Sequence, residues 1–137
     1  MRKKVSFLSI PLVIFILAFS TVVADKTLMI LDITVSEAHT LIDDRKDAPD
    51  FIILDVRTEA EYLERHIESA LNIDYRGEDF YGRLEELDRD DTYLLYCRSG
   101  RRSRRALEIM KELGFRSIYH LSKGFMSWQE EDLPFSK

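Results

Sequence analysis

The sequence predicts an α/β fold in which helices cover both faces of a mostly parallel sheet. Short apolar runs alternate with helical patterns, the order in which parallel strands and their crossover helices follow one another. Two runs, Phe51–Leu54 and Thr92–Tyr96, are nearly continuous in apolar residues, as is typical of strands buried on both faces. No repeat or Pro/Gly-rich linker follows Asp25, so we expect one domain.

In the first half of the chain, capping boxes mark the helix starts. Thr34 and Glu37 have the spacing at which each side chain bonds the other residue's backbone N–H, and Thr58 and Glu61 repeat it. The predicted strands are Leu28–Ile33, Phe51–Leu54 and Ala70–Ile73, and the predicted helices are Ser36–Asp43 and a short one after Thr58 with Ala60, Tyr62 and Leu63.

In the second half, the strongest helical pattern is Arg101–Leu113. Its apolar residues recur at helical spacing, and Gly114 follows as a C-terminal cap. The other predicted elements here are a helix over Phe80–Leu87, strands over Thr92–Tyr96 and Ser117–Leu121, and a helical turn or two over Phe125–Glu131.

Composition excludes several classes of protein. With 137 residues, 45% of them apolar and 33% charged, the chain is a folded protein of one-domain size. Its single cysteine excludes an intrachain disulfide and a multi-cysteine metal site. A net charge of −5 disfavours a general nucleic-acid binder, which needs clustered surplus cations.

The N-terminus has the layout of a secretory signal peptide. Three basic residues, Arg2 to Lys4, precede the uncharged run Val5–Ala24, which ends in small residues before Asp25. This predicts a signal peptide over residues 1–24 and an exported, periplasmic or extracytoplasmic domain over 25–137 with a net charge of −8. The alternative is an uncleaved membrane anchor, because 20 uncharged residues are long enough to span a bilayer.

The lone cysteine, Cys97, lies where a predicted central strand ends and a helix begins. Sites in open parallel sheets form beyond the carboxyl ends of strands. A turn with Gly100 can direct several backbone N–H groups into one concavity, and the helix N-terminus adds positive potential. These features favour a thiolate, so we expect a lowered Cys97 pKa and a nucleophilic sulfur rather than a buried inert thiol. The loop residues that follow are Arg98, Ser99, Gly100, Arg101, Arg102 and Ser103.

Three ordered motifs resemble those of the rhodanese-like sulfurtransferases. They are Asp55-Val56-Arg57 with Glu61-Tyr62 and His66-Ile67-x-x-Ala70-x-Asn72-Ile73; the loop Cys97-Arg98-Ser99-Gly100-x-Arg102-Ser103; and Gly114-Phe115, Leu121, Gly124 and Trp128. Two positions depart from the family pattern. Lys123 replaces the first residue of a frequent glycine pair, and Ser69 stands where glycine is frequent in the first motif.

The resemblance implies a three-layer rhodanese-like fold and a two-step reaction. Cys97 would take the outer sulfur of thiosulfate or a similar donor as a persulfide, then pass it to a thiol, cyanide or protein acceptor. The loop N–H groups from Arg98 to Ser103 would hold the persulfide, and Arg98, Arg101 and Arg102 would attract the donor. The resemblance is closest to small exported single-domain members, which implies a monomer with no cofactor or metal, no nucleic-acid partner, and membrane contact only through an uncleaved N-terminus.

Several residues and functions have more than one interpretation. Asp55 and Arg57 either brace the loop, as the resemblance suggests, or form an ordinary salt bridge. We expect His66 to be structural, and His39 and His120 to be surface or structural residues. Arg104 and Arg105 are expected on a solvated helix face. Alternative functions are a non-catalytic persulfide carrier and a cysteine phosphatase or arsenate reductase, although Arg102 comes one position early for the latter. A disulfide oxidoreductase lacks a resolving cysteine.

Overall fold

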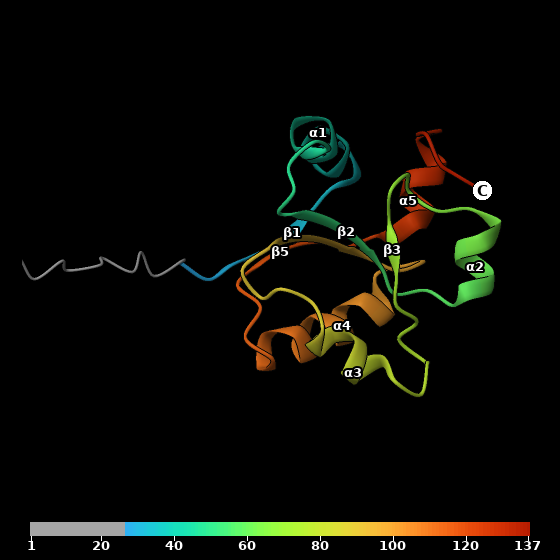
Figure 1. The fold of residues 1–137 in the computed structure, drawn as a ribbon. Helices are drawn as coiled ribbons and strands as arrows, with labels where there is room; N and C mark the ends of the chain where they lie inside the picture. Colours follow the sequence, from blue (N-terminus) through green and yellow to red (C-terminus); the bar gives the residue numbers. More distant parts are fainter. Residues whose placement is uncertain (1–26) are drawn as a thin grey trace, which may run out of the picture.

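Parallel strands form the central layer of this computed structural model, which describes residues 27–137 (Figure 1). Within that range the sheet has five strands in the order β1-β5-β4-β2-β3, all paired in parallel. They are β1 (Met29–Ile33), β2 (Phe51–Asp55), β3 (Leu71–Asn72), β4 (Thr92–Tyr96) and β5 (Ser117–Leu121). The predicted signal peptide or anchor, residues 1–24, lies outside the described residues.

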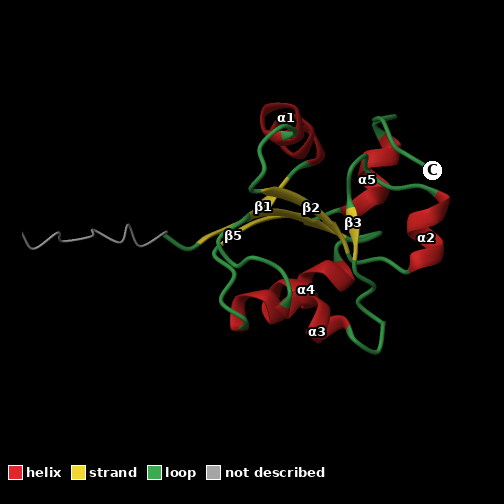
Figure 2. Ribbon diagram, viewed as in Figure 1, coloured by secondary structure: helices red, strands yellow, loops and turns green. Residues whose placement is uncertain are grey.

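Helices cover both faces of this sheet, which confirms the predicted α/β class (Figure 2). On one face lie α1 (Val35–Arg45) and α5 (Gly124–Glu130), and on the other lie α3 (Phe80–Glu85) and α4 (Arg101–Glu112). A short helix, α2 (Glu59–Glu64), lies beside the β3 edge. Between residues 27 and 137, no helix combines the length and the apolar character needed to cross a bilayer.

Element boundaries follow local chemistry. Both predicted capping boxes are formed: the Thr34 and Thr58 hydroxyls accept from backbone N–H groups three residues on, and the Glu37 and Glu61 carboxylates accept in return. The first helix, α1, runs beyond the predicted range on both sides and ends at Arg45. The strand β3 is shorter than predicted, because only two of its residues pair with the edge of β2.

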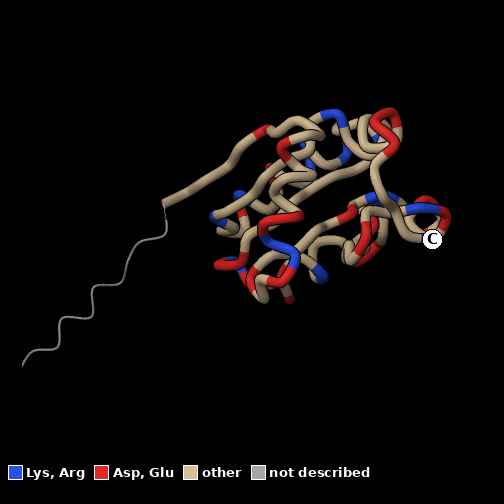
Figure 3. Tube along the Cα trace, turned by 90° about the horizontal axis from the view of Figure 1, so that it is seen from above, with Lys and Arg blue, Asp and Glu red and all other residues tan. Residues whose placement is uncertain are grey.

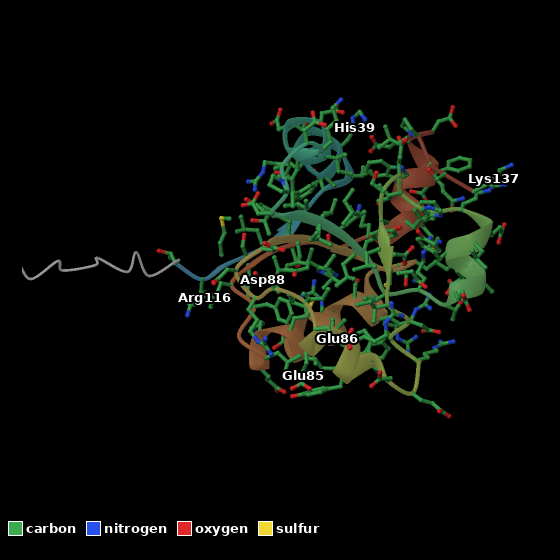
Figure 4. The ribbon with its side chains drawn as sticks, viewed as in Figure 1. His39, Glu85, Glu86, Asp88, Arg116 and Lys137 are labelled. Carbon is green, nitrogen blue, oxygen red and sulfur yellow. The ribbon has the colours of Figure 1, made fainter. Side chains whose placement is uncertain are left out.

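The core has two halves, one on each face of the sheet. Tyr93 and Leu95 of β4 point towards α3 and α4, whereas Leu94 and Tyr96 point towards α1 and α5, as the two-residue repeat of a strand requires. Side chains fill the space between the sheet and the helices on both faces (Figure 4). The four β4 residues Tyr93 to Tyr96 are fully buried, as the continuous apolar run predicts.

The strand order places a topological switch point between β2 and β4. The chain continues from β2 to β3 on one side and from β4 to β5 on the other, so the loops after β2 and β4 diverge. Cys97 follows β4 there, and Val56 and Arg57 follow β2. The fold therefore brings the first and second sequence motifs to the same edge of the sheet.

Candidate active site

The sulfur of Cys97 lies in a cradle of hydrogen-bond donors. Its Sγ accepts from the Gly100 backbone N–H at 3.1 Å and from the Ser103 hydroxyl at 3.3 Å. The cysteine is only 1% exposed, and this burial raises its pKa. Donors from Ser103, Ser99 and Gly100 outweigh burial, so the pKa of Cys97 lies below its ordinary value. A buried sulfur that favours the thiolate is suited to act as a nucleophile.

Gly100 closes the cradle, and its backbone conformation explains why a glycine stands there. It is the N-cap of α4 and has a left-handed φ of +89°. A Cβ at this position would overlap the Ser122 carbonyl oxygen on the loop after β5. The chain can therefore turn from β4 into α4 over one short loop only if this residue lacks a side chain.

A second glycine lets α5 approach the loop from behind. The N–H groups of Phe125 and Met126 donate to the carbonyls of Cys97 and Arg98, at 2.8 and 3.0 Å. Gly124 has φ +66°, and a Cβ there would lie 2.5 Å from the Arg98 carbonyl oxygen. Lys123, which replaces the first glycine of the family's pair, has ordinary helical angles. Only the second glycine of the pair is thus needed here.

The departure at Ser69 is accommodated differently. Ser69 adopts a φ of +64° in the turn before β3, a conformation that costs a side-chain-bearing residue roughly 1–2 kcal/mol. The residue is exposed, so no neighbouring backbone blocks its side chain. The serine therefore strains this turn without touching the Cys97 loop.

Asp55 and Arg57 form a buried ion pair beneath the loop. The guanidinium donates to both carboxylate oxygens, at 2.6 to 3.0 Å, and to the Arg65 carbonyl. Its plane also lies over the Phe125 ring, 4.3 Å from the centroid. The Phe125 backbone N–H donates to the Cys97 carbonyl, so the ion pair connects the end of β2 to the helix that supports the loop. Among the described interactions, neither Asp55 nor Arg57 contacts the sulfur directly.

Five arginines line a cleft next to the cradle. The cleft has a volume of about 270 Å³, and its lining residues are Arg98 and Ser99 from the loop, Arg101, Arg102 and Arg105 from α4, and Tyr75 and Arg76 from the segment before α3. Acidic segments are spread around much of the fold (Figure 3). The cleft beside Cys97 is thus a local basic region in an acidic domain, as the cluster of arginines in the sequence predicted.

Arg102 lies at the same cleft but is already paired. Its guanidinium donates to both oxygens of Glu61 at 2.7 and 2.8 Å, and this bidentate contact lowers the pKa of Glu61 to about 2. Glu61 also caps α2, so one carboxylate ties α2 to the first turn of α4. The charge of Arg102 is therefore largely balanced within the protein.

The structure narrows one expectation about the charged residues near this loop and corrects another. His120, expected to be a surface or structural residue, is fully buried on β5, with Nε2 2.8 Å from the Ser103 hydroxyl and Nδ1 2.7 Å from Asp32. Arg104 is half-exposed but also contacts Asp32, at 2.7 Å, and does not only face solvent. Sequence reasoning missed these contacts because Asp32 and His120 are 88 positions apart. The sequence indicated only that Asp32 and His120 each lie in a predicted strand.

The other histidines have structural surroundings. His66 stacks on Tyr62 and bonds the Tyr62 carbonyl oxygen at 2.8 Å, in agreement with the expected structural role. His39 lies on α1 (Figure 4). Its ring makes a T-shaped contact with the Trp128 ring, with 5.7 Å between the centroids. Over residues 27–137 no group of three or more histidine, cysteine or acidic side chains is arranged to hold a metal ion.

Comparisons with known proteins agree with this geometry. The family model described as a rhodanese-like domain matches residues 34–131. A sulfurtransferase of Allochromatium vinosum is 31% identical over 88 residues, 64% of this chain and 80% of that protein. The thiosulfate sulfurtransferase GlpE of Coxiella burnetii is 34% identical over 80 residues, 58% of this chain and 73% of that protein. A solved rhodanese-related protein of Thermoplasma volcanium superposes with a TM-score of 0.63 and 27% identity, covering 77% of this chain and 96% of that one.

The Gly124→Ala variant tests the support of the loop from α5. The added Cβ meets the Arg98 and Cys97 carbonyls in a left-handed conformation, so we expect a loss of at least ~2 kcal/mol in unfolding free energy and slower alkylation of Cys97. Denaturant unfolding and iodoacetamide labelling measure both. Lys123→Ala, one residue earlier at ordinary angles, is the matched control and should match the wild type. Equal stability of the two variants would contradict this account.

Proposed function

This chain belongs to the rhodanese-like domain family, and we propose that it moves a sulfane sulfur from thiosulfate or a similar donor to a thiophilic acceptor through a persulfide on Cys97. The observation that carries this proposal is the cradle around Sγ. The nucleophile lies at the end of β4 with backbone and hydroxyl donors aimed at it, and its pKa is lowered despite burial. Relatives named as sulfurtransferases support the same class of reaction.

In the first half-reaction the Cys97 thiolate attacks the outer sulfur of thiosulfate. A new S–S bond forms, the bond to the sulfonate sulfur breaks, and its electron pair leaves with sulfite. In the second half-reaction the acceptor attacks the outer sulfur of the persulfide, and Cys97 leaves as a thiolate. This is covalent catalysis with double-displacement kinetics. The cradle stabilises negative charge on sulfur at each stage, through donors that need no rearrangement.

The arginine cleft supplies attraction for an anionic donor. Thiosulfate and sulfite each carry two negative charges, and Arg98 and Arg101 reach the cleft with no ion pair among the described contacts. Arg102 is engaged with Glu61, so we assign it chiefly to positioning. The backbone N–H groups from Arg98 to Ser103 would hold the persulfide, and Asp55 with Arg57 would brace the loop from below.

A sulfur substrate fits the loop better than a phosphate does. A cysteine phosphatase needs a longer loop and an arginine free to grasp the phosphoryl oxygens. Here the arginine nearest to that position, Arg102, donates both of its terminal nitrogens to Glu61. The loop surrounds one atom, Sγ, through Gly100 and Ser103. These contacts support sulfur transfer over phosphate hydrolysis.

We also propose that residues 1–24 direct export of a domain that comprises residues 25–137. Support comes from the basic start, the apolar run and the small residues that end at Ala24. Fractionation of cells expressing the full chain should place the domain outside the cytoplasm, and N-terminal sequencing should then begin at Asp25 for a cleaved signal or at the original N-terminus for an anchor. A cytoplasmic product with an intact N-terminus would contradict export.

The Cys97→Ser variant tests the nucleophile. We expect loss of thiocyanate formation from thiosulfate and cyanide, because a serine hydroxyl cannot form a persulfide. Mass spectrometry of the wild type after thiosulfate exposure should show one added sulfur, and cyanide should remove it catalytically. A stable adduct without turnover would instead indicate a persulfide carrier. Full activity of Cys97→Ser would refute the proposed mechanism.

Substitution of the cleft arginines tests donor binding. Arg98→Ala and Arg101→Ala should each raise KM for thiosulfate by roughly tenfold, the loss of one charge-assisted contact. Steady-state kinetics at low ionic strength measures this, and added salt should weaken wild-type donor binding in the same direction. Arg45→Ala, on α1 across the sheet, is the control and should leave KM unchanged. Unchanged KM in both loop variants would place donor recognition elsewhere.

A further inference from the structure

A chain of polar contacts runs from the nucleophile to the far edge of the sheet. The Cys97 sulfur lies 3.3 Å from the Ser103 hydroxyl, which lies 2.8 Å from Nε2 of His120. On the other side of the ring, Nδ1 lies 2.7 Å from one oxygen of Asp32, and Arg104 binds the second oxygen at 2.7 Å. The sulfur-transfer steps described above make no use of His120, a fully buried titratable residue.

The protons of this series of hydrogen bonds can be placed in two ways. Asp32 accepts from Nδ1–H, so Nε2 is an acceptor when the ring is neutral. Ser103 has one hydroxyl proton, which it then donates to Nε2, and its oxygen accepts from the Cys97 thiol. If Ser103 instead donates to a Cys97 thiolate, Nε2 must carry a proton and the ring is an imidazolium. The two arrangements differ by the shift of one proton across each of two hydrogen bonds.

We propose that His120, oriented by Asp32, accepts the proton of the Cys97 thiol through Ser103 and so generates the attacking thiolate. The inference rests on the proposed sulfurtransferase function and assigns this site its proton acceptor. Ser103 touches the reacting sulfur, whereas His120 acts through it and is a positioning residue. Asp32 has the orienting role that a carboxylate has beside many catalytic histidines: it selects the Nδ1–H tautomer and stabilises the cation when it forms.

The electrostatic surroundings suit a proton acceptor. The titratable and charged groups that face the ring are Asp32 from β1, Arg104 from α4 and, through Ser103, Cys97 after β4. Burial lowers the pKa of His120, Asp32 raises it, and the Arg104 charge lowers it. Burial and Arg104 thus favour the neutral ring, and Asp32 stabilises the cation that forms when the ring takes a proton. Arg104 and His120 lower the pKa of Asp32, which keeps its carboxylate ionised.

The proton balances over the two half-reactions. In the first, Cys97 forms its S–S bond, sulfite leaves, and the thiol proton stays on Nε2 after passing across Ser103. In the second, cyanide or another acceptor removes the outer sulfur and Cys97 leaves as a thiolate. The imidazolium then returns its proton through Ser103, which restores the thiol. No oxidant or reductant is required, and no proton has to cross the buried loop from solvent.

The sheet holds this arrangement rigidly. Asp32 and His120 are direct partners in the β1–β5 pairing, and His120 is also opposite Leu95, two residues before Cys97, in the β4–β5 pairing. Ser103 lies in the first turn of α4 and is fully buried. Three neighbouring strands and one helix thus bring the four groups together. Both ring nitrogens lie at hydrogen-bond distance from polar partners, so the ring connects Ser103 on one side with the Asp32 carboxylate on the other.

The pH dependence of Cys97 alkylation by iodoacetamide tests the relay without requiring turnover. In His120→Gln the thiolate loses its imidazolium partner, and in Asp32→Asn the imidazolium loses the carboxylate that stabilises it. We expect the inflection of the alkylation rate to move up by about one pH unit, which slows labelling at neutral pH roughly tenfold. At alkaline pH the rates should converge with the wild type, because the thiolate then forms without an acceptor. Asp32→Asn changes a half-exposed residue and keeps the test available if His120→Gln does not fold.

His39→Gln is the matched control, because His39 lies on α1, on the opposite face of the sheet from α4 (Figure 4). Its profile should superimpose on the wild type. Unshifted inflections in both relay variants would overturn the proposal, and so would rates lowered equally at every pH, since that result indicates a distorted loop. Turnover of thiosulfate and cyanide by the wild type separates the proton relay from the proposed function. Turnover with unshifted pH profiles of alkylation would refute the relay alone, whereas absence of turnover would refute the proposed function.

Discussion

The site depends on the two hydrogen bonds by which α5 holds the carbonyls of Cys97 and Arg98. In a trans peptide the C=O and the following N–H point in opposite directions. Fixing these two carbonyls towards α5 therefore turns the N–H groups of Arg98 and Ser99 away from it, towards the cradle side of the loop. Gly124 permits the close approach, and Gly100 permits the return of the chain into α4. The cradle is thus set by backbone packing between segments that follow β4 and β5.

The electrostatics of the site combine opposing effects. Burial of Cys97 disfavours a thiolate, but the donors around Sγ reverse the balance, and the His120–Asp32 pair offers a place for the displaced proton. Outside the cradle, arginines create a basic cleft on a domain whose residues 25–137 carry a net charge of −8. Among the described residues, Arg57 and Arg102 are paired with carboxylates, whereas the exposed cleft arginines Arg76, Arg98, Arg101 and Arg105 have no described ion pair.

Much of the fold could be predicted because its signals are local. The capping boxes at Thr34 and Thr58, the apolar run of β4 and the helical spacing of α4 each depend on residues within one turn or one strand. The two-residue strand β3 was predicted too long, because its length depends on how much of β2 is left to pair. The departure at Lys123 also became clear only from backbone angles, which show that one glycine suffices.

By itself the sequence determined the layer order, the place of Cys97 at the end of a buried strand and the concentration of arginines after it. These follow from periodicity and from neighbouring residues, which the chain order alone specifies. Only the tertiary structure decided which charges are free and which are paired: Arg102 with Glu61, Arg104 with Asp32, and His120 between Asp32 and Ser103. Each of these pairs joins residues from different elements. The physical reason is that strand pairing and helix docking set the distances between such side chains, and no local pattern encodes them.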